Sequence, residues 1–133
     1  MTNAQRSLWT FLIYTLIGPF LAAVAVLIGS MVLSVAGLLP DSASAPGFAL
    51  QAFVLGVFIA GIAGAGLAAL TSLRGSFSWL EAAIAGVLGF MAVALGSGAV
   101  ASSHLTVLAF LSACIALACR ALLVRIRILP GGA

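Results

Sequence analysis

The chain has very few charged residues and contains no lysine. Of its 133 residues, 5% are charged and 65% are hydrophobic, and the mean hydropathy is +1.38. A soluble domain carries about 25% charged residues, which cover its surface. The low charge therefore excludes a water-facing surface for most of the chain. We predict an integral membrane protein that forms one domain over residues 1–133 and is surrounded by the lipid bilayer.

Residues that carry catalysis or bind metals are also scarce. The acids are Asp41 and Glu81, and His104 is the single histidine. No serine–histidine–carboxylate set, glycine-rich phosphate loop or paired-carboxylate arrangement is present, and no metal-site spacing occurs. The middle third of each apolar stretch lacks ionisable residues, which are typical of proton relays and charged selectivity rings. We therefore expect no enzymatic activity, no cofactor and no metal.

Four apolar stretches are long enough to cross a membrane. Each reaches the roughly 20 residues that span about 30 Å of hydrocarbon, and polar or turn-forming residues separate them. The pattern predicts an all-α protein, a bundle of four transmembrane helices, with no strands. The expected spans are residues 16–39, 47–72, 79–99 and 104–125.

The first apolar run is unusually long because it already begins at Leu8. As one helix it would measure about 48 Å, which exceeds the hydrocarbon thickness. Pro19 removes a helix hydrogen bond and offers a break. We predict that residues 7–17 form an interfacial or kinked entry with Trp9 and Tyr14 at headgroup level. A single tilted helix with a mild kink is the alternative.

The positive charges predict the orientation. With four spans, all five arginines fall on one side of the membrane: Arg6, Arg74, Arg120, Arg125 and Arg127. They adjoin apolar runs and do not form a clustered basic face with aromatic readers, which argues against nucleic acid. The positive-inside rule predicts that both termini are cytoplasmic, in a bacterial inner membrane. We expect Arg74, Arg120, Arg125 and Arg127 to anchor this side and contact lipid headgroups.

Small residues recur at four-residue spacing in the second span. The row comprises Ala52, Gly56, Ala60, Gly64 and Ala68, and Gly61, Ala65 and Ala69 form a second row beside it. Gly86 belongs to a similar pattern in the third span. Such rows let helices approach closely and associate by dispersion contacts. They could pack within the bundle or against another chain.

Ser78 and Glu81 have the spacing of a capping box at the start of the third span. The carboxylate could also pair with Arg74 or Arg120 on the same side. A structural role is expected for Glu81, since it stands at a span end and not at mid-membrane.

These features favour a non-catalytic accessory or scaffold subunit that docks against other transmembrane helices, in a hetero-complex or a homo-oligomer. A homo-oligomeric channel or small-solute transporter component is the alternative, with backbone carbonyls and hydroxyls lining a pore between copies. A third possibility is a lipid-binding protein that uses the segment 120–127.

Overall fold

The fold is a bundle of four apolar helices. The computed structural model describes residues 1–37, 45–98 and 105–131. Its helices are α1 (Asn3–Val35), α2 (Ala45–Arg74), α3 (Trp79–Gly96) and α4 (Leu105–Arg125), and the described residues form no strand. Each helix is long and apolar enough to cross a membrane, which confirms the predicted fold class. His104 lies outside the described residues.

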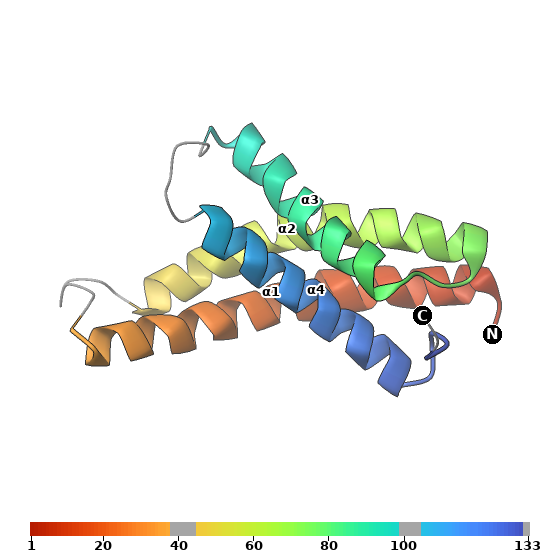
Figure 1. Cartoon of the computed structure of the whole chain (residues 1–133), viewed down its shortest axis with the longest axis horizontal. Helices are drawn as coiled ribbons and strands as arrows, with labels where there is room; N and C mark the ends of the chain where they lie inside the picture. The colour runs from red at the N-terminus through yellow and green to blue at the C-terminus, as the bar shows by residue number, and fades with distance from the viewer. Residues whose placement is uncertain (38–44, 99–104, 132–133) are drawn as a thin grey trace.

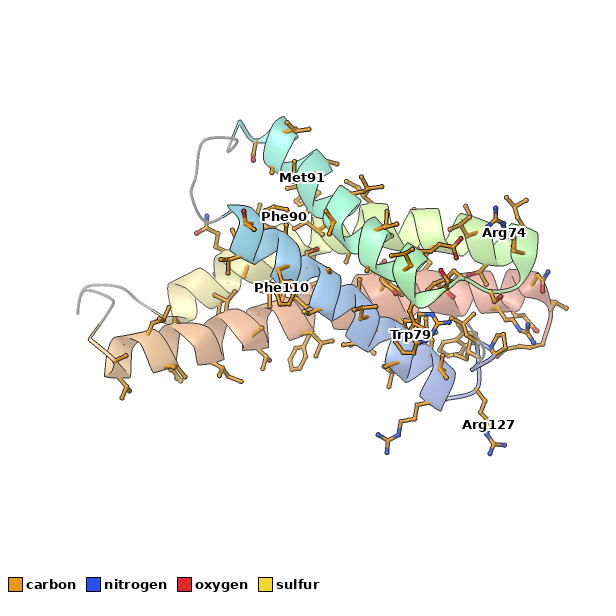
Figure 2. All side chains as sticks on the ribbon, in the orientation of Figure 1. Arg74, Trp79, Phe90, Met91, Phe110 and Arg127 are labelled. Atoms are coloured by element: carbon orange, nitrogen blue, oxygen red, sulfur yellow. The ribbon has the colours of Figure 1, made fainter. Side chains whose placement is uncertain are left out.

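Helices α1 and α2 form a long antiparallel pair, and α3 and α4 pack across it (Figure 1). The two termini and the α2–α3 turn (75–78) lie at one end of the bundle, here called the inner end. At the opposite, outer end, the α1–α2 pair extends beyond α3 and α4. Figure 2 shows Arg74 and Arg127 at the inner end. The predicted placement of both termini on the side of Arg74 is therefore present in the fold.

The expected break at Pro19 is absent, and the first span is one helix, as in the alternative prediction. Helix α1 runs without interruption through Pro19 and measures about 50 Å. A Cβ built on Gly56 would lie 3.2 Å from Pro19 Cα, and one built on Gly18 would lie 3.2 Å from the Ala60 Cβ. Close packing against α2 supports the helix at Pro19, where the proline removes one helix hydrogen bond. Neighbouring helices commonly compensate for such a loss in membranes. The helix begins at Asn3 and therefore includes the segment 7–17 that precedes the expected span.

The expected position of Tyr14 at headgroup level is also wrong. Its side chain is buried in the core, and its hydroxyl donates a 2.8 Å hydrogen bond to the carbonyl oxygen of Ala116 on α4. Trp9 lies one turn nearer the N-terminus and is 46% exposed. Tyr14 therefore joins α1 to α4, whereas Trp9 faces outward.

The ends of α3 and α4 follow local rules. Ser78 and Glu81 form a reciprocal capping box that begins α3. Beyond α4, Arg127 has a positive φ of 60°, its amide bonds to the Val124 carbonyl, and the Ile128 amide bonds to the Leu123 carbonyl. This is a Schellman motif with arginine where glycine is usual. The apolar contact typical of the motif is present, since Leu123 and Ile128 both belong to the buried core.

Candidate functional site

The predicted interface row of α2 lies against α1 of the same chain. Gly56, Ala60, Gly64 and Ala68 are all buried. A Cβ on Gly64 would lie 3.0 Å from the Tyr14 Cβ, so the backbones are as close here as at Pro19. Ala52 is partly buried and lines the central cavity. In this fold the row holds the bundle together and is not available to a partner.

Gly86 of α3 also makes an internal contact. A Cβ built on it would lie 2.8 Å from both the Ala116 Cβ and the Ser112 carbonyl oxygen of α4. The Ser112 hydroxyl donates a 2.7 Å hydrogen bond to the Gly86 carbonyl. The glycine therefore permits a close approach of α3 to α4.

The second row of small residues on α2 lies on the adjacent face, about 100° around the helix from the first row. Ala65 and Ala69 are exposed, and a Cβ on Gly61 would meet no atom within 4 Å. The spacing of the two rows does not distinguish them in the sequence. Only the position of α1 shows which row is covered.

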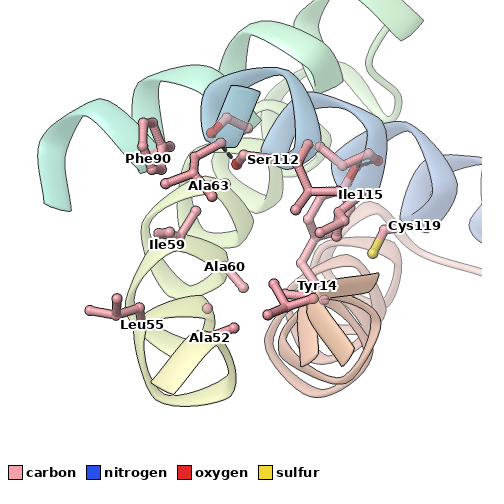
Figure 3. A pocket seen from close by; sticks show the side chains of 18 residues that line it. Tyr14, Ala52, Leu55, Ile59, Ala60, Ala63, Phe90, Ser112, Ile115 and Cys119 are labelled. Carbon is pink, nitrogen blue, oxygen red and sulfur yellow. Dashed lines mark hydrogen bonds between the residues drawn. The ribbon is translucent and has the colours of Figure 1, made fainter. Parts of the chain in front are cut away.

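A cavity of about 130 Å³ lies between the four helices (Figure 3). Its walls are mainly apolar, and two hydroxyl-bearing residues reach them, Tyr14 and Ser112. Both hydroxyls already donate to backbone carbonyls, on Ala116 and Gly86 respectively. An apolar cavity of this size stays dry unless polar partners hold water. The cavity therefore lacks the lining that an ion or a polar solute would need.

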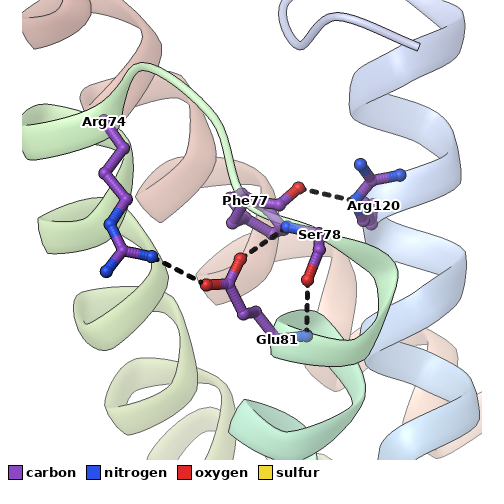
Figure 4. A network of polar contacts seen from close by, with 5 residues as sticks. All are labelled: Arg74, Phe77, Ser78, Glu81 and Arg120. Carbon is purple, nitrogen blue, oxygen red and sulfur yellow. Dashed lines mark hydrogen bonds and ion pairs between the residues drawn. The ribbon is translucent and has the colours of Figure 1, made fainter. Parts of the chain in front are cut away.

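Polar side chains gather at the inner end (Figure 4). Arg74 Nη1 lies 3.1 Å from Glu81 Oε1, and Glu81 Oε2 accepts a 2.6 Å hydrogen bond from the Ser78 amide. The same carboxylate thus caps α3 and pairs with the last residue of α2. This arrangement fixes the short turn between the two helices.

Arg120 of α4 joins this cluster from the other side. Its Nε donates a 3.0 Å hydrogen bond to the Phe77 carbonyl, and its guanidinium carbon lies 4.1 Å from the Trp79 ring centroid. The side chain is 1% exposed. The expectation that Arg120 reaches the lipid headgroups is therefore wrong, because the turn and Trp79 cover it. Arg125 and Arg127 are exposed at the helix end.

An open apolar groove separates α2 from α3 over part of their length. It has a volume of about 350 Å³ and is bounded by Ile62, Gly66 and Leu70 of α2 and by Ile84 and Leu88 of α3. Glu81 also borders the groove. This groove was not predictable from the sequence, because it depends on how α3 packs against α2.

Within the described part of the chain, no three His, Cys, Asp or Glu side chains lie close enough together to hold a metal ion. No protein-family model, curated protein or solved structure matches the chain. The packing surfaces, the groove and the charges of the molecule are therefore the features from which a function can be inferred.

Proposed function

We propose that this chain is a non-catalytic membrane subunit that docks on a helix of another membrane protein through the exposed face of α2. The observation that carries the proposal is the row of small residues in which Ala65 and Ala69 are exposed and a Cβ on the partly buried Gly61 would meet no atom within 4 Å. Lipid tails gain nothing from small residues, whereas a partner helix gains close backbone contact. Phe58, which is 62% exposed, lies about two turns before Ala65 on the same side of α2 and bounds the row of small residues.

The central cavity supports a non-catalytic and non-transporting role. A solute path needs carbonyls, hydroxyls or charges directed into it. Here the hydroxyls of Tyr14 and Ser112 are engaged in holding helices together. A channel built from this chain would need its pore between copies.

The inner end is proposed to face the cytoplasm of a bacterial cell. Arginines outnumber acids there, and the positive-inside rule favours this orientation. A cysteine introduced at Arg74 should react with a membrane-impermeant maleimide only after the cytoplasmic side is opened. Labelling of intact cells or spheroplasts would contradict the orientation.

The docking proposal can be tested with matched leucine variants. Ala65→Leu places a large side chain on the exposed row, and Ala118→Leu makes the same change at an exposed position of α4. Quantitative mass spectrometry after mild-detergent purification should show a co-purifying membrane protein that is reduced several-fold in A65L and retained in A118L.

Three results would count against docking. They are a wild-type chain that elutes as a lone monomer, equal recovery of partners in both variants, and solute flux through liposomes that contain the purified chain alone. The last result would favour the homo-oligomeric channel.

A further inference from the structure

The α2–α3 groove ends at an ion pair. Along α2 it is bounded by Ile62, Gly66 and Leu70, which are spaced by four residues and line one face. Glu81 borders the groove near the α2–α3 turn, and its carboxylate lies 3.1 Å from Arg74. The side chains of Arg74 and Glu81 are 68% and 33% exposed, so both charges are accessible from the membrane surface. The apolar groove thus ends beside one positive and one negative charge.

The dimensions of the groove match one leaflet of a bilayer. From Ile62 to Leu70 the helix rises about 12 Å, close to half of the roughly 30 Å hydrocarbon core. Helix α2 ends at Arg74 and α3 begins at Trp79, both at the inner end of the bundle, so we expect the ion pair at headgroup level. A single acyl chain of a lipid in that leaflet would lie along the groove with its headgroup beside Arg74 and Glu81.

We infer that the groove binds one phospholipid whose headgroup carries both a phosphate and a primary ammonium, as in phosphatidylethanolamine. The phosphate accepts hydrogen bonds from the Arg74 guanidinium, and the ammonium donates to Glu81. The headgroup has one negative and one positive charge, and each faces the opposite charge of the ion pair. The site with bound lipid is therefore neutral. A phosphatidylglycerol headgroup would add an anion beside Glu81 with no second cation for it. A phosphatidylcholine headgroup has no ammonium hydrogen to donate.

The charged groups, and not the apolar walls, must supply the selectivity. An acyl chain gains little by leaving other acyl chains for a protein groove, because both surroundings are apolar. The groove positions the lipid, and the headgroup contacts distinguish it from its neighbours. One partly exposed charged contact is worth up to about 1 kcal/mol, which corresponds to about a fivefold preference.

This inference is independent of the proposed docking function. The docking row is Gly61, Ala65 and Ala69, whereas Gly66 lines the groove on a neighbouring face of α2. A chain without a protein partner could still bind the lipid, and a docked chain could lack it. The purified protein is sufficient for the test.

Native mass spectrometry of the full chain from detergent micelles can measure lipid binding directly. Phosphatidylethanolamine, phosphatidylcholine and phosphatidylglycerol with identical acyl chains would be titrated separately. We expect the first bound lipid to be phosphatidylethanolamine, favoured about fivefold over each of the others. Equal binding of all three would indicate annular lipid and overturn the inference, as would a preference for phosphatidylglycerol. These comparisons use the wild-type chain, so they do not depend on the folding of any variant.

Two glycines provide a matched steric pair. A Cβ on Gly66 and a Cβ on Gly61 both meet open space, but only Gly66 lines the groove. Gly66→Leu should abolish the first binding step, whereas Gly61→Leu should bind lipid like the wild type. Equal behaviour of the two variants would mean that the lipid does not occupy the groove.

The contributions of the Glu81 and Arg74 charges to lipid binding can be tested one at a time without removing the helix cap. Glutamine is a normal capping-box residue, so Glu81→Gln removes the charge while the cap is kept. E81Q should lose the preference for phosphatidylethanolamine over phosphatidylcholine and keep its phosphate contact. Arg74→Gln should weaken binding of all three lipids. An unchanged preference in E81Q would overturn the assignment of the ammonium to Glu81.

Discussion

Substitution of Gly86 by alanine tests the α3–α4 contact most directly. The added Cβ would lie 2.8 Å from Ala116 Cβ and 2.8 Å from the Ser112 carbonyl oxygen. The carbonyl belongs to the backbone of α4 and cannot rotate away, so one helix must shift. The shift would also lengthen the 2.7 Å hydrogen bond from the Ser112 hydroxyl to Gly86.

The expected change in the free energy of unfolding combines two destabilising effects and one stabilising effect. Overpacking costs about 1–3 kcal/mol, and weakening one hydrogen bond between membrane helices costs about 0.6 kcal/mol. Alanine is favoured over glycine within a helix by about 1 kcal/mol, which offsets part of the loss. We therefore expect Gly86→Ala to lower the free energy of unfolding by about 1–2 kcal/mol.

The assay is reversible unfolding in mixed micelles with increasing SDS, followed by tryptophan fluorescence. Gly66→Ala is the control, because its Cβ meets no atom within 4 Å. It should be as stable as the wild type or more stable by up to about 1 kcal/mol. If G86A proved at least as stable as G66A, the close approach of α3 and α4 described here would be refuted.

Three further substitutions can be measured in the same unfolding assay. Tyr14→Phe should cost about 1 kcal/mol because the Ala116 carbonyl loses its donor, and a wild-type value would show that this bond contributes nothing. Arg127→Gly should stabilise the chain by about 1 kcal/mol, since glycine adopts positive φ without strain, whereas lower stability would contradict the Schellman turn. Arg120→Lys should cost about 1–2 kcal/mol, because an ammonium replaces neither the planar stacking on Trp79 nor the directed bond. Unchanged tryptophan emission together with unchanged stability would argue against that stacking.

The sequence was sufficient to predict the four helices and the inner end because both follow from one-dimensional quantities. Apolar length decides which segments can span, and the position of arginines along the chain decides which ends lie together. The start of α3 was also predictable, since Ser78 and Glu81 satisfy a local rule that needs no neighbour. These features depend on residues within a few positions of each other.

The continuity of α1 was not predictable from the same evidence. The propensity of Pro19 argues for a break, and nothing within α1 opposes it. The opposing contact comes from Gly56 and Ala60, which lie about 40 residues away and permit close packing at that level. Tertiary packing therefore outweighed local propensity.

The burial of Tyr14 and Arg120 inside the bundle was not predicted from the sequence, for a related reason. Sequence position gives the level of a side chain along the membrane normal, but not the direction in which it points around its helix. Arg120 lies beside the α2–α3 turn, as expected, but its side chain points into the bundle and donates to the Phe77 carbonyl. Tyr14 packs beside Gly64, about 15 Å along α2 from Arg74, and its hydroxyl donates to the Ala116 carbonyl. The helix crossing that brings these carbonyls into reach has no signature in the sequence.

Directed hydrogen bonds and close backbone contacts hold the helices together on either side of the groove. Near the inner end, helices are joined by directed bonds: Ser7 donates to the Ala68 carbonyl, and Arg120 donates to that of Phe77. Towards the outer end, the Ser30 hydroxyl donates to the Leu27 carbonyl of its own helix. Apolar side chains gain little free energy by leaving lipid for another helix, because both surroundings are apolar. Hydrogen bonds and close backbone contacts therefore decide which helix faces pack together. The α2–α3 gap lies between the Arg74–Glu81 pair at the turn and a close contact at Gly89, where an added Cβ would lie 2.8 Å from the Ile59 carbonyl oxygen, so its inner end is beside two accessible charges.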